Sequence, residues 1–244
     1  MNQANRLEQV WSALGTVTDP EIDESVTTLQ FVTRVELEGD SRVKIEFRLP
    51  TYWCAPNFAF LMASDMRDAV AQLPWVEAVS VELLDHFSAN VVNRSVARKQ
   101  DFRDAFPGET DGDLSQLRQT FLGKSYQRRQ ELLIRHMLKK GIDLAWLMQA
   151  TLRELKALPL DEEGSSLRDL YDFSWRRIRP DSSEQALAFM TVDGTPVEPG
   201  EFRTYLRKVA GVRRNADFNG LICRGLLAAR NGSAPKVQKD YSLG

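Results

Sequence analysis

Cysteine and histidine are scarce in this chain of 244 residues, which contains two of each. Two cysteines do not form a disulfide framework of the kind that stabilises small secreted domains. Two thiolates also cannot complete the four-sulfur coordination of a structural zinc site or an iron–sulfur cluster. A metal or cluster held through Cys54 or Cys223 would therefore have to be shared with another subunit, another protein or a small thiol.

Long hydrophobic runs are also lacking. No stretch approaches the roughly 18 consecutive apolar residues that a membrane-spanning helix needs, and the mean hydropathy is -0.36. The first residues, MNQANRLEQVW, contain no apolar core of a secretory signal. We therefore expect a cytoplasmic protein that has no membrane partner and whose cysteines stay reduced.

Familiar catalytic motifs are missing too: the sequence contains no phosphate-binding loop, no GxGxxG, no HExxH and no CxxC. The net charge of -2 is unevenly distributed. Residues 1–100 hold 9 basic and 14 acidic residues, and the remainder holds 23 basic and 20 acidic ones, which predicts two parts with different surfaces. The isoelectric point near 5.8 argues against a nucleic-acid partner.

Residues 1–88 are predicted to form a small α+β domain. The clearest element is the strand 43–49, in which apolar residues alternate with Lys44, Glu46 and Arg48. We expect a helix over 7–15, a strand over 27–39, a turn at Gly39, a helix over 57–73 and a strand over 76–84. Helices covering one face of a small sheet make a compact unit.

The rest of the chain is predicted to be a linker over 89–112, a mainly helical extension over 113–230 and a disordered tail over 231–244. Within the extension, Gly123 is expected to interrupt a helix, Asp193-Gly194 to form a hairpin turn, and two separate helices to cover 201–212 and 216–230. Cys223 is expected to pack inside the last helix.

Cys54 lies in the loop Thr51–Asn57, between the end of a predicted strand and the start of a predicted helix. The N-terminus of a helix favours a thiolate over a thiol, and the thiolate is the form that ligates iron, accepts sulfur or attacks disulfides. A hydroxyl at Thr51 would orient the loop. Considered alone, a single loop cysteine is also commonly a small buried hydrophobe.

Four segments in order, DPEI at 19–22, SVTTLQFV, PTYWCAPN and PWVEAVSVEL, resemble the SufT/PaaD-like iron–sulfur cluster assembly domain over residues 5–85. The resemblance implies a role in maturing iron–sulfur or related metalloproteins. It implies that Cys54 is the functional thiol, with Asp19, Glu21 and Thr51 in support. The family usually places proline directly after this cysteine, whereas Ala55 intervenes here. Because relatives of the PaaD branch serve oxygenases, the resemblance suggests a metal-dependent oxygenase as client.

The leading hypothesis is an accessory factor, not a turnover enzyme: a carrier, adaptor or chaperone that meets a client metalloprotein or a cluster-assembly protein. Its cargo would be an iron–sulfur cluster or iron, held transiently at Cys54. His86, after the last strand, is a second candidate metal ligand. One alternative is a thiol enzyme that uses Cys54 for sulfur transfer or redox chemistry. The absence of a resolving cysteine nearby in the sequence counts against it. Another alternative is a non-catalytic scaffold for protein interactions. Separately, the segment DPEI could be a turn of solvated acids without a direct functional role. Self-association of the chain is left open.

Overall fold

The computed structural model describes residues 2–108, 114–230 and 232. The chain divides into two compact units, the first comprising Met1–Leu114 with Phe218–Gly244 and the second comprising Ser115–Asp217. None of the helices in the described ranges has both the length and the apolar character needed to cross a membrane. The expected tail over 231–244 lies outside the described residues, apart from Gly232.

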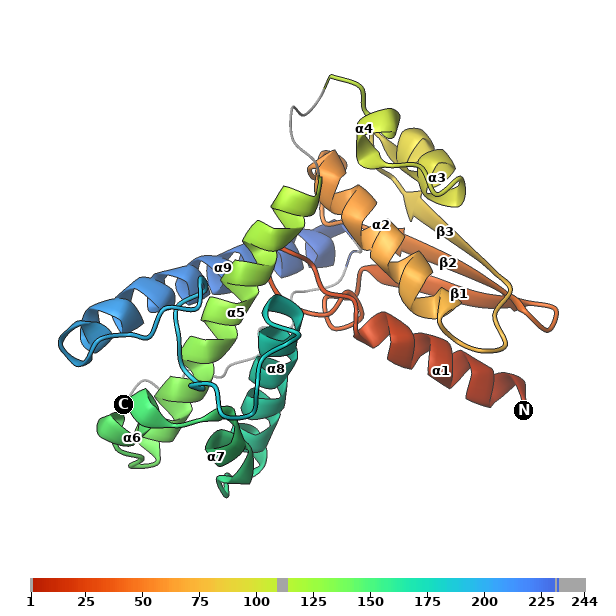
Figure 1. Ribbon diagram of the computed structural model, residues 1–244. Helices are drawn as coiled ribbons and strands as arrows, with labels where there is room; N and C mark the ends of the chain where they lie inside the picture. The colour runs from red at the N-terminus through yellow and green to blue at the C-terminus, as the bar shows by residue number, and fades with distance from the viewer. Residues whose placement is uncertain (1, 109–113, 231, 233–244) are drawn as a thin grey trace. The chain divides into compact units, whose positions relative to one another are not determined.

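The first unit is built on a three-stranded sheet with the order β1-β2-β3 (Figure 1). β1 (Val32–Glu38) pairs antiparallel with β2 (Arg42–Arg48) across the turn at Gly39, whose φ of 67° suits glycine. β2 pairs in parallel with β3 (Ala78–Leu84), so the chain must cross over between them. That crossover is α2 (Pro56–Ala71), while α1 (Gln3–Gly15), α3 (Ala89–Ala97) and α4 (Phe102–Ala105) complete the unit.

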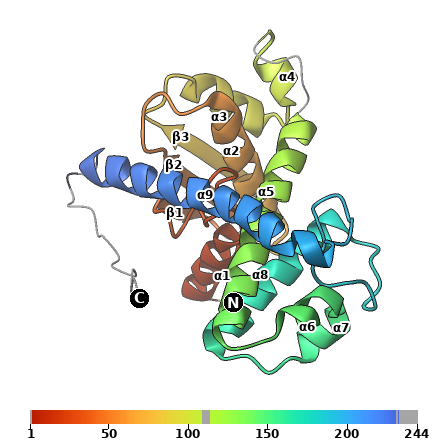
Figure 2. The same ribbon diagram turned by 90° about the vertical axis from the view of Figure 1, so that its left-hand side faces the viewer.

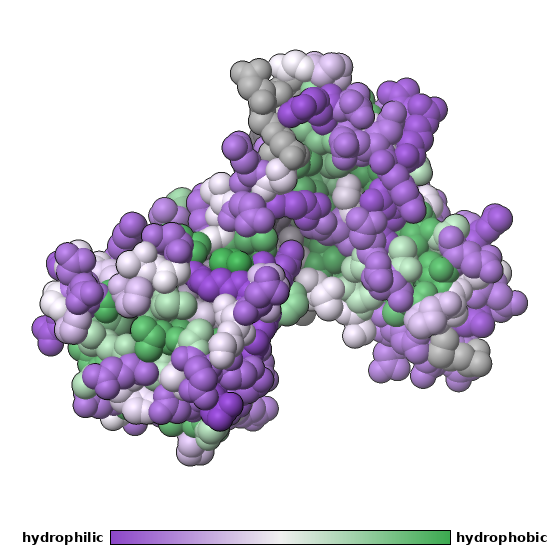
Figure 3. Space-filling model, in the orientation of Figure 1, coloured by the Kyte–Doolittle hydropathy of each residue, from purple (hydrophilic) through white to green (hydrophobic). Residues whose placement is uncertain are grey.

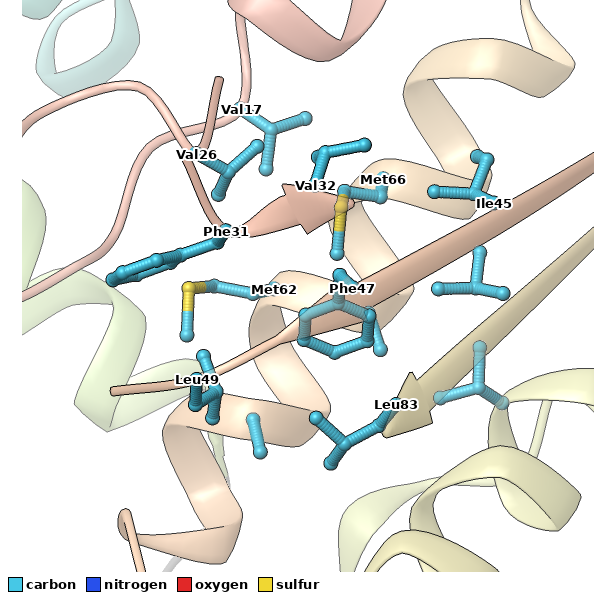
Figure 4. Close-up of a cluster of buried hydrophobic side chains, with 14 of the residues drawn as sticks. Val17, Val26, Phe31, Val32, Ile45, Phe47, Leu49, Met62, Met66 and Leu83 are labelled. Carbon is cyan, nitrogen blue, oxygen red and sulfur yellow. The ribbon is translucent and has the colours of Figure 1, made fainter. Parts of the chain in front are cut away.

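The alternation in β2 produces the core of this unit. Val43, Ile45 and Phe47 are buried against helix residues, because successive side chains of a strand point to opposite faces. Figure 4 shows Met62 and Met66 of α2 on the same side as Phe47. On the other face Lys44 forms ion pairs with Glu46 at 2.9 Å and with Glu82 at 3.1 Å. The predicted α+β class is confirmed.

Two segments of the first unit differ from the expectation. The first strand begins at Val32 rather than at Thr27, because residues 27–31 form turns in which Gln30 has a φ of 59°. Residues 89–112, assigned to a linker from sequence, include α3 and α4. Their apolar side chains join the core, which explains why this stretch folds; these are Val92, Val96, Phe102 and Phe106.

The second unit is mainly helical, as predicted. All of α5 (Leu114–Lys139) except its first residue belongs to this unit. The other elements are α6 (Leu144–Gln149), α7 (Leu152–Ala157), α8 (Glu162–Ile178), the 3₁₀ turn Pro199–Glu201 and the first half of α9 (Phe202–Arg230). Trp175, Tyr126 and Tyr171 are its largest fully buried side chains. The amide of Gln130 donates to both tyrosine hydroxyls and to the carbonyl of Met190, so this buried polar group is satisfied.

Two local expectations in the helical region are wrong, and a third is confirmed. α5 continues through Gly123, where a Cβ would lie 3.0 Å from Cγ2 of Val192, so glycine permits close packing instead of ending the helix. α9 is one helix rather than two and continues through Gly211. Asp193-Gly194 forms the expected turn, with Gly194 at a φ of 88°, and the turn closes a single antiparallel bridge between Met190 and Pro196.

Candidate functional site

The cysteine loop joins β2 to α2. Leu49 is buried after the last residue of β2, and α2 begins at Pro56, a residue that suits the first helical turn because it lacks an N–H. Cys54 is half-buried and packs against the core of the first unit. Its Sγ lies 3.1 Å from Oγ1 of Thr51. The structure therefore brings together the thiol and the hydroxyl that the sequence singled out.

His86 holds this loop in place from the segment after β3. The N–H of Ser88 donates to Nδ1 of His86, so the proton of the neutral ring is on Nε2, which donates to the carbonyl of Cys54 at 2.7 Å. Burial is the main cause that lowers the pKa of His86, which keeps the ring neutral. Both ring nitrogens are engaged, which supports a positioning role more than the predicted role as metal ligand.

The acidic segment DPEI is organised by Asp19. One oxygen of this buried carboxyl accepts the backbone N–H groups of Glu21 and Ile22, each at 2.9 Å. Burial raises the pKa of Asp19 to about 6, although these N–H groups oppose the rise. Asp19 thus shapes the turn from inside, whereas Glu21 is exposed. The sequence hypothesis of a turn with solvated acids describes Glu21 but not Asp19.

The C-terminal half of α9 also belongs to this unit (Figure 2). Leu227 is buried in its core, and Arg224 forms an ion pair of 2.7 Å with Glu24 beside the acidic segment. Arg230 donates to the carbonyls of Leu49 and Asp85, each at 2.7 Å, at the ends of β2 and β3. The last turns of α9 therefore lie against the elements that carry the cysteine loop and His86.

Cys223 lies on this part of α9, where it packs inside the last helix as expected. It is half-buried and packs against the same core as Cys54. Burial raises the pKa of its thiol to about 12, and negative charge at Asp19, Cys54 and Glu21 adds to the rise. The spacing of Cys223 and Leu227, one helical turn apart, was the local signal that they share a face.

Exposed aromatic rings flank the cysteine. Trp53 is 74% exposed, and Tyr52 and Phe87 are each more than half exposed. The rings of Tyr52 and Phe87 lie 6.3 Å apart, and the N–H of Phe87 donates to the carbonyl of Tyr52. Large apolar side chains at the surface commonly mark a contact site for another molecule.

The described residues include no group of three or more histidine, cysteine, aspartate or glutamate side chains arranged to hold a metal ion. A cation or cluster bound through Cys54 would thus need ligands from outside this set.

Part of the chain matches a known family. Residues 7–83 match the model of the iron–sulfur cluster assembly protein family. The resemblance is thereby confirmed for the N-terminal third, and it supports a general role in iron–sulfur cluster assembly. The matched segment includes Asp19, Glu21, Thr51 and Cys54, whereas no family model matches the rest of the chain, where His86 and Cys223 lie. A search of curated proteins found no match.

Replacing His86 by alanine is expected to loosen the cysteine loop. The change leaves the carbonyl of Cys54 without its donor and removes a buried ring, so local opening should become easier. Chymotrypsin cleavage after the exposed Tyr52 and Trp53 should accelerate about 3- to 10-fold under native conditions. His136→Ala, at the other histidine and in the second unit, is the control. Equal cleavage of the loop in both variants would show that His86 does not position it.

Proposed function

We propose that this protein is an accessory factor for metalloprotein maturation, which uses Cys54 to contact an iron–sulfur cluster or iron as transient cargo. It would act as a carrier, adaptor or chaperone rather than as a turnover enzyme. The observation that carries the proposal is the contact of 3.1 Å between Thr51 and Cys54, within the segment that matches the assembly family. The thiolate is the form of cysteine that binds iron, and in that form only the hydroxyl of Thr51 could be the donor in this contact.

The aromatic surface around Cys54 supports the idea that the site is completed by another protein. Trp53 and Tyr52 are exposed beside a thiol that needs ligands from elsewhere. Tryptophan and tyrosine are enriched among the residues that contribute most to protein interfaces. A client or assembly partner covering these rings would exclude water from the cargo and supply the remaining thiolates.

The second unit would recognise the client. On the face drawn in Figure 3 hydrophilic side chains predominate, and hydrophobic side chains show through in patches. On α8 the side chains of Leu170 and Phe173 are about half exposed and lie three residues apart, so they share one face of the helix. A metal-dependent oxygenase, suggested by the resemblance to the PaaD branch, is our proposed client.

Anaerobic reconstitution tests the role of Cys54. The full chain is incubated with ferrous iron and sulfide, and glutathione supplies the missing thiols. Wild-type protein is expected to gain sulfur-to-iron charge-transfer absorbance, which should fall to background in Cys54→Ser and Cys54→Ala. The two variants separate loss of the thiol from loss of volume at this half-buried position, and thermal melting reports whether they fold. Full absorbance in both folded variants would rule out Cys54 as the contact for the cargo.

Two further measurements separate the alternatives. Turnover of a persulfide or peroxide by the purified protein, lost in Cys54→Ser, would favour a thiol enzyme instead. If Cys54→Ser restores maturation of the client in cells that lack the native gene, both thiol-based functions fail, and a non-catalytic scaffold remains.

A further inference from the structure

The face of α9 that contains Cys223 is directed at the first unit. Gly220, three residues before Cys223, lies so close that a Cβ there would be 3.1 Å from Cγ2 of Ile22. Leu227, four residues after it, is buried in the core of the same unit. Residues three and four apart lie on one face of a helix, so Cys223 faces the unit between these two contacts.

The elements opposite this face are the acidic segment and the ends of β2 and β3. At one end Arg224 pairs with Glu24 next to the acidic segment, and at the other end Arg230 binds the carbonyls of Leu49 and Asp85. The cysteine loop starts directly after Leu49 and is tied to the residue that follows Asp85, because His86 donates to the carbonyl of Cys54. Cys223 thus lies beside the acidic segment, on the part of α9 whose last residue reaches the start of the cysteine loop.

Electrostatics agrees with this placement. Burial is the main cause that raises the pKa of the Cys223 thiol, and Asp19, Cys54 and Glu21 lie close enough to add to the rise. Besides burial, the groups that disfavour a bare thiolate at Cys223 are therefore two acids and a second sulfur. A cation would be attracted to such a cluster and would offset its mutual repulsion.

We infer that Cys223 and Cys54 together form a two-sulfur site for a thiophilic cation, with the remaining ligands supplied by a partner or a small thiol. Each thiol releases its proton when its sulfur bonds to the cation, so no oxidant is needed. The identity of the cargo, ferrous iron or the iron of a cluster, rests on the proposed function. The pairing of the two sulfurs does not. α9 would therefore contribute a ligand from outside the segment that matches the assembly family.

Phenylarsine oxide tests the pairing of the two sulfurs, because one arsenic atom bonds to two thiols with loss of one water. The chain has only two cysteines, so every adduct can be assigned by intact mass. Reduced full-length protein should bind one arsenical and retain it against mercaptoethanol about 100-fold better than Cys54→Ser or Cys223→Ser, since the second bond forms intramolecularly. Cys223→Ala repeats the test without a new polar group, and Ile222→Ala, at an exposed neighbour, should behave as wild type.

Wild-type retention no better than that of the single variants would overturn the inference, as would retention that survives Cys223→Ser. Cadmium titration then probes the cation itself. The ultraviolet charge-transfer absorbance of sulfur bonded to cadmium should fall by about half or more in either single variant, and an unchanged signal in the Cys223 variants would again refute a two-sulfur site.

The outcome is separable from that of the proposed function. If chelation fails while iron–sulfide reconstitution still depends on Cys54, only the role of Cys223 is lost. If chelation succeeds while reconstitution does not depend on Cys54, the paired sulfurs remain and the cargo is not an iron–sulfur cluster.

Discussion

Leu227→Ala is expected to lower the free energy of unfolding by about 2–4 kcal/mol. The side chain is 3% exposed and lies in the core of the first unit, together with residues of the sheet and of α2. Its truncation removes apolar contacts and leaves a cavity that the surrounding side chains fill only in part. Urea unfolding, followed by tryptophan fluorescence, measures the loss.

Leu226 provides a matched control, since it is the same residue type one position earlier on the same helix and is 43% exposed. Leu226→Ala should change stability by less than about 0.5 kcal/mol. Similar small effects for both leucines would show that the last turns of α9 do not pack on the first unit. The basis for placing Cys223 near Cys54 would then be removed.

Asp19→Asn is expected to stabilise the protein at neutral pH by up to roughly 3 kcal/mol. The pKa of Asp19 rises from an ordinary 3.8 to about 6 because the carboxyl is buried. The folded state therefore holds this proton more tightly than the unfolded state does. Below about pH 4 the protonated Asp19 therefore contributes fully to the free energy of unfolding of the wild type. This contribution is lost as the pH rises through about 6.

Asparagine keeps the oxygen that accepts the N–H groups of Glu21 and Ile22 but carries no charge, so the turn should persist. The stability difference between variant and wild type should grow between about pH 4 and pH 7. Comparing the two proteins at each pH cancels the contribution of groups that they share. A stability difference that does not vary with pH would mean that burial does not raise the pKa of Asp19.

Local patterns were reliable where a residue's structural partners lie a few positions away. The alternation from Val43 to Phe47 produced a strand with one buried face. The thiol of Cys54 lies between a strand and a helix, as predicted from Pro50 and Pro56. The pattern misled at Gly123, because the cost of glycine in a helix, about 1 kcal/mol, is small beside the packing of a long helix.

The sequence by itself determined the fold class, the family resemblance of the first third and the loop that holds Cys54. Only the tertiary structure decided which residues surround that thiol. His86 reaches the carbonyl of Cys54 across 32 positions, and Arg230 reaches Leu49 across 181. Such contacts depend on how distant apolar faces bury one another, for which no short sequence pattern exists. Cys54 was therefore predictable as a thiol in a loop, whereas the position of Cys223 beside the acidic segment was visible only from the packing of the last turns of α9.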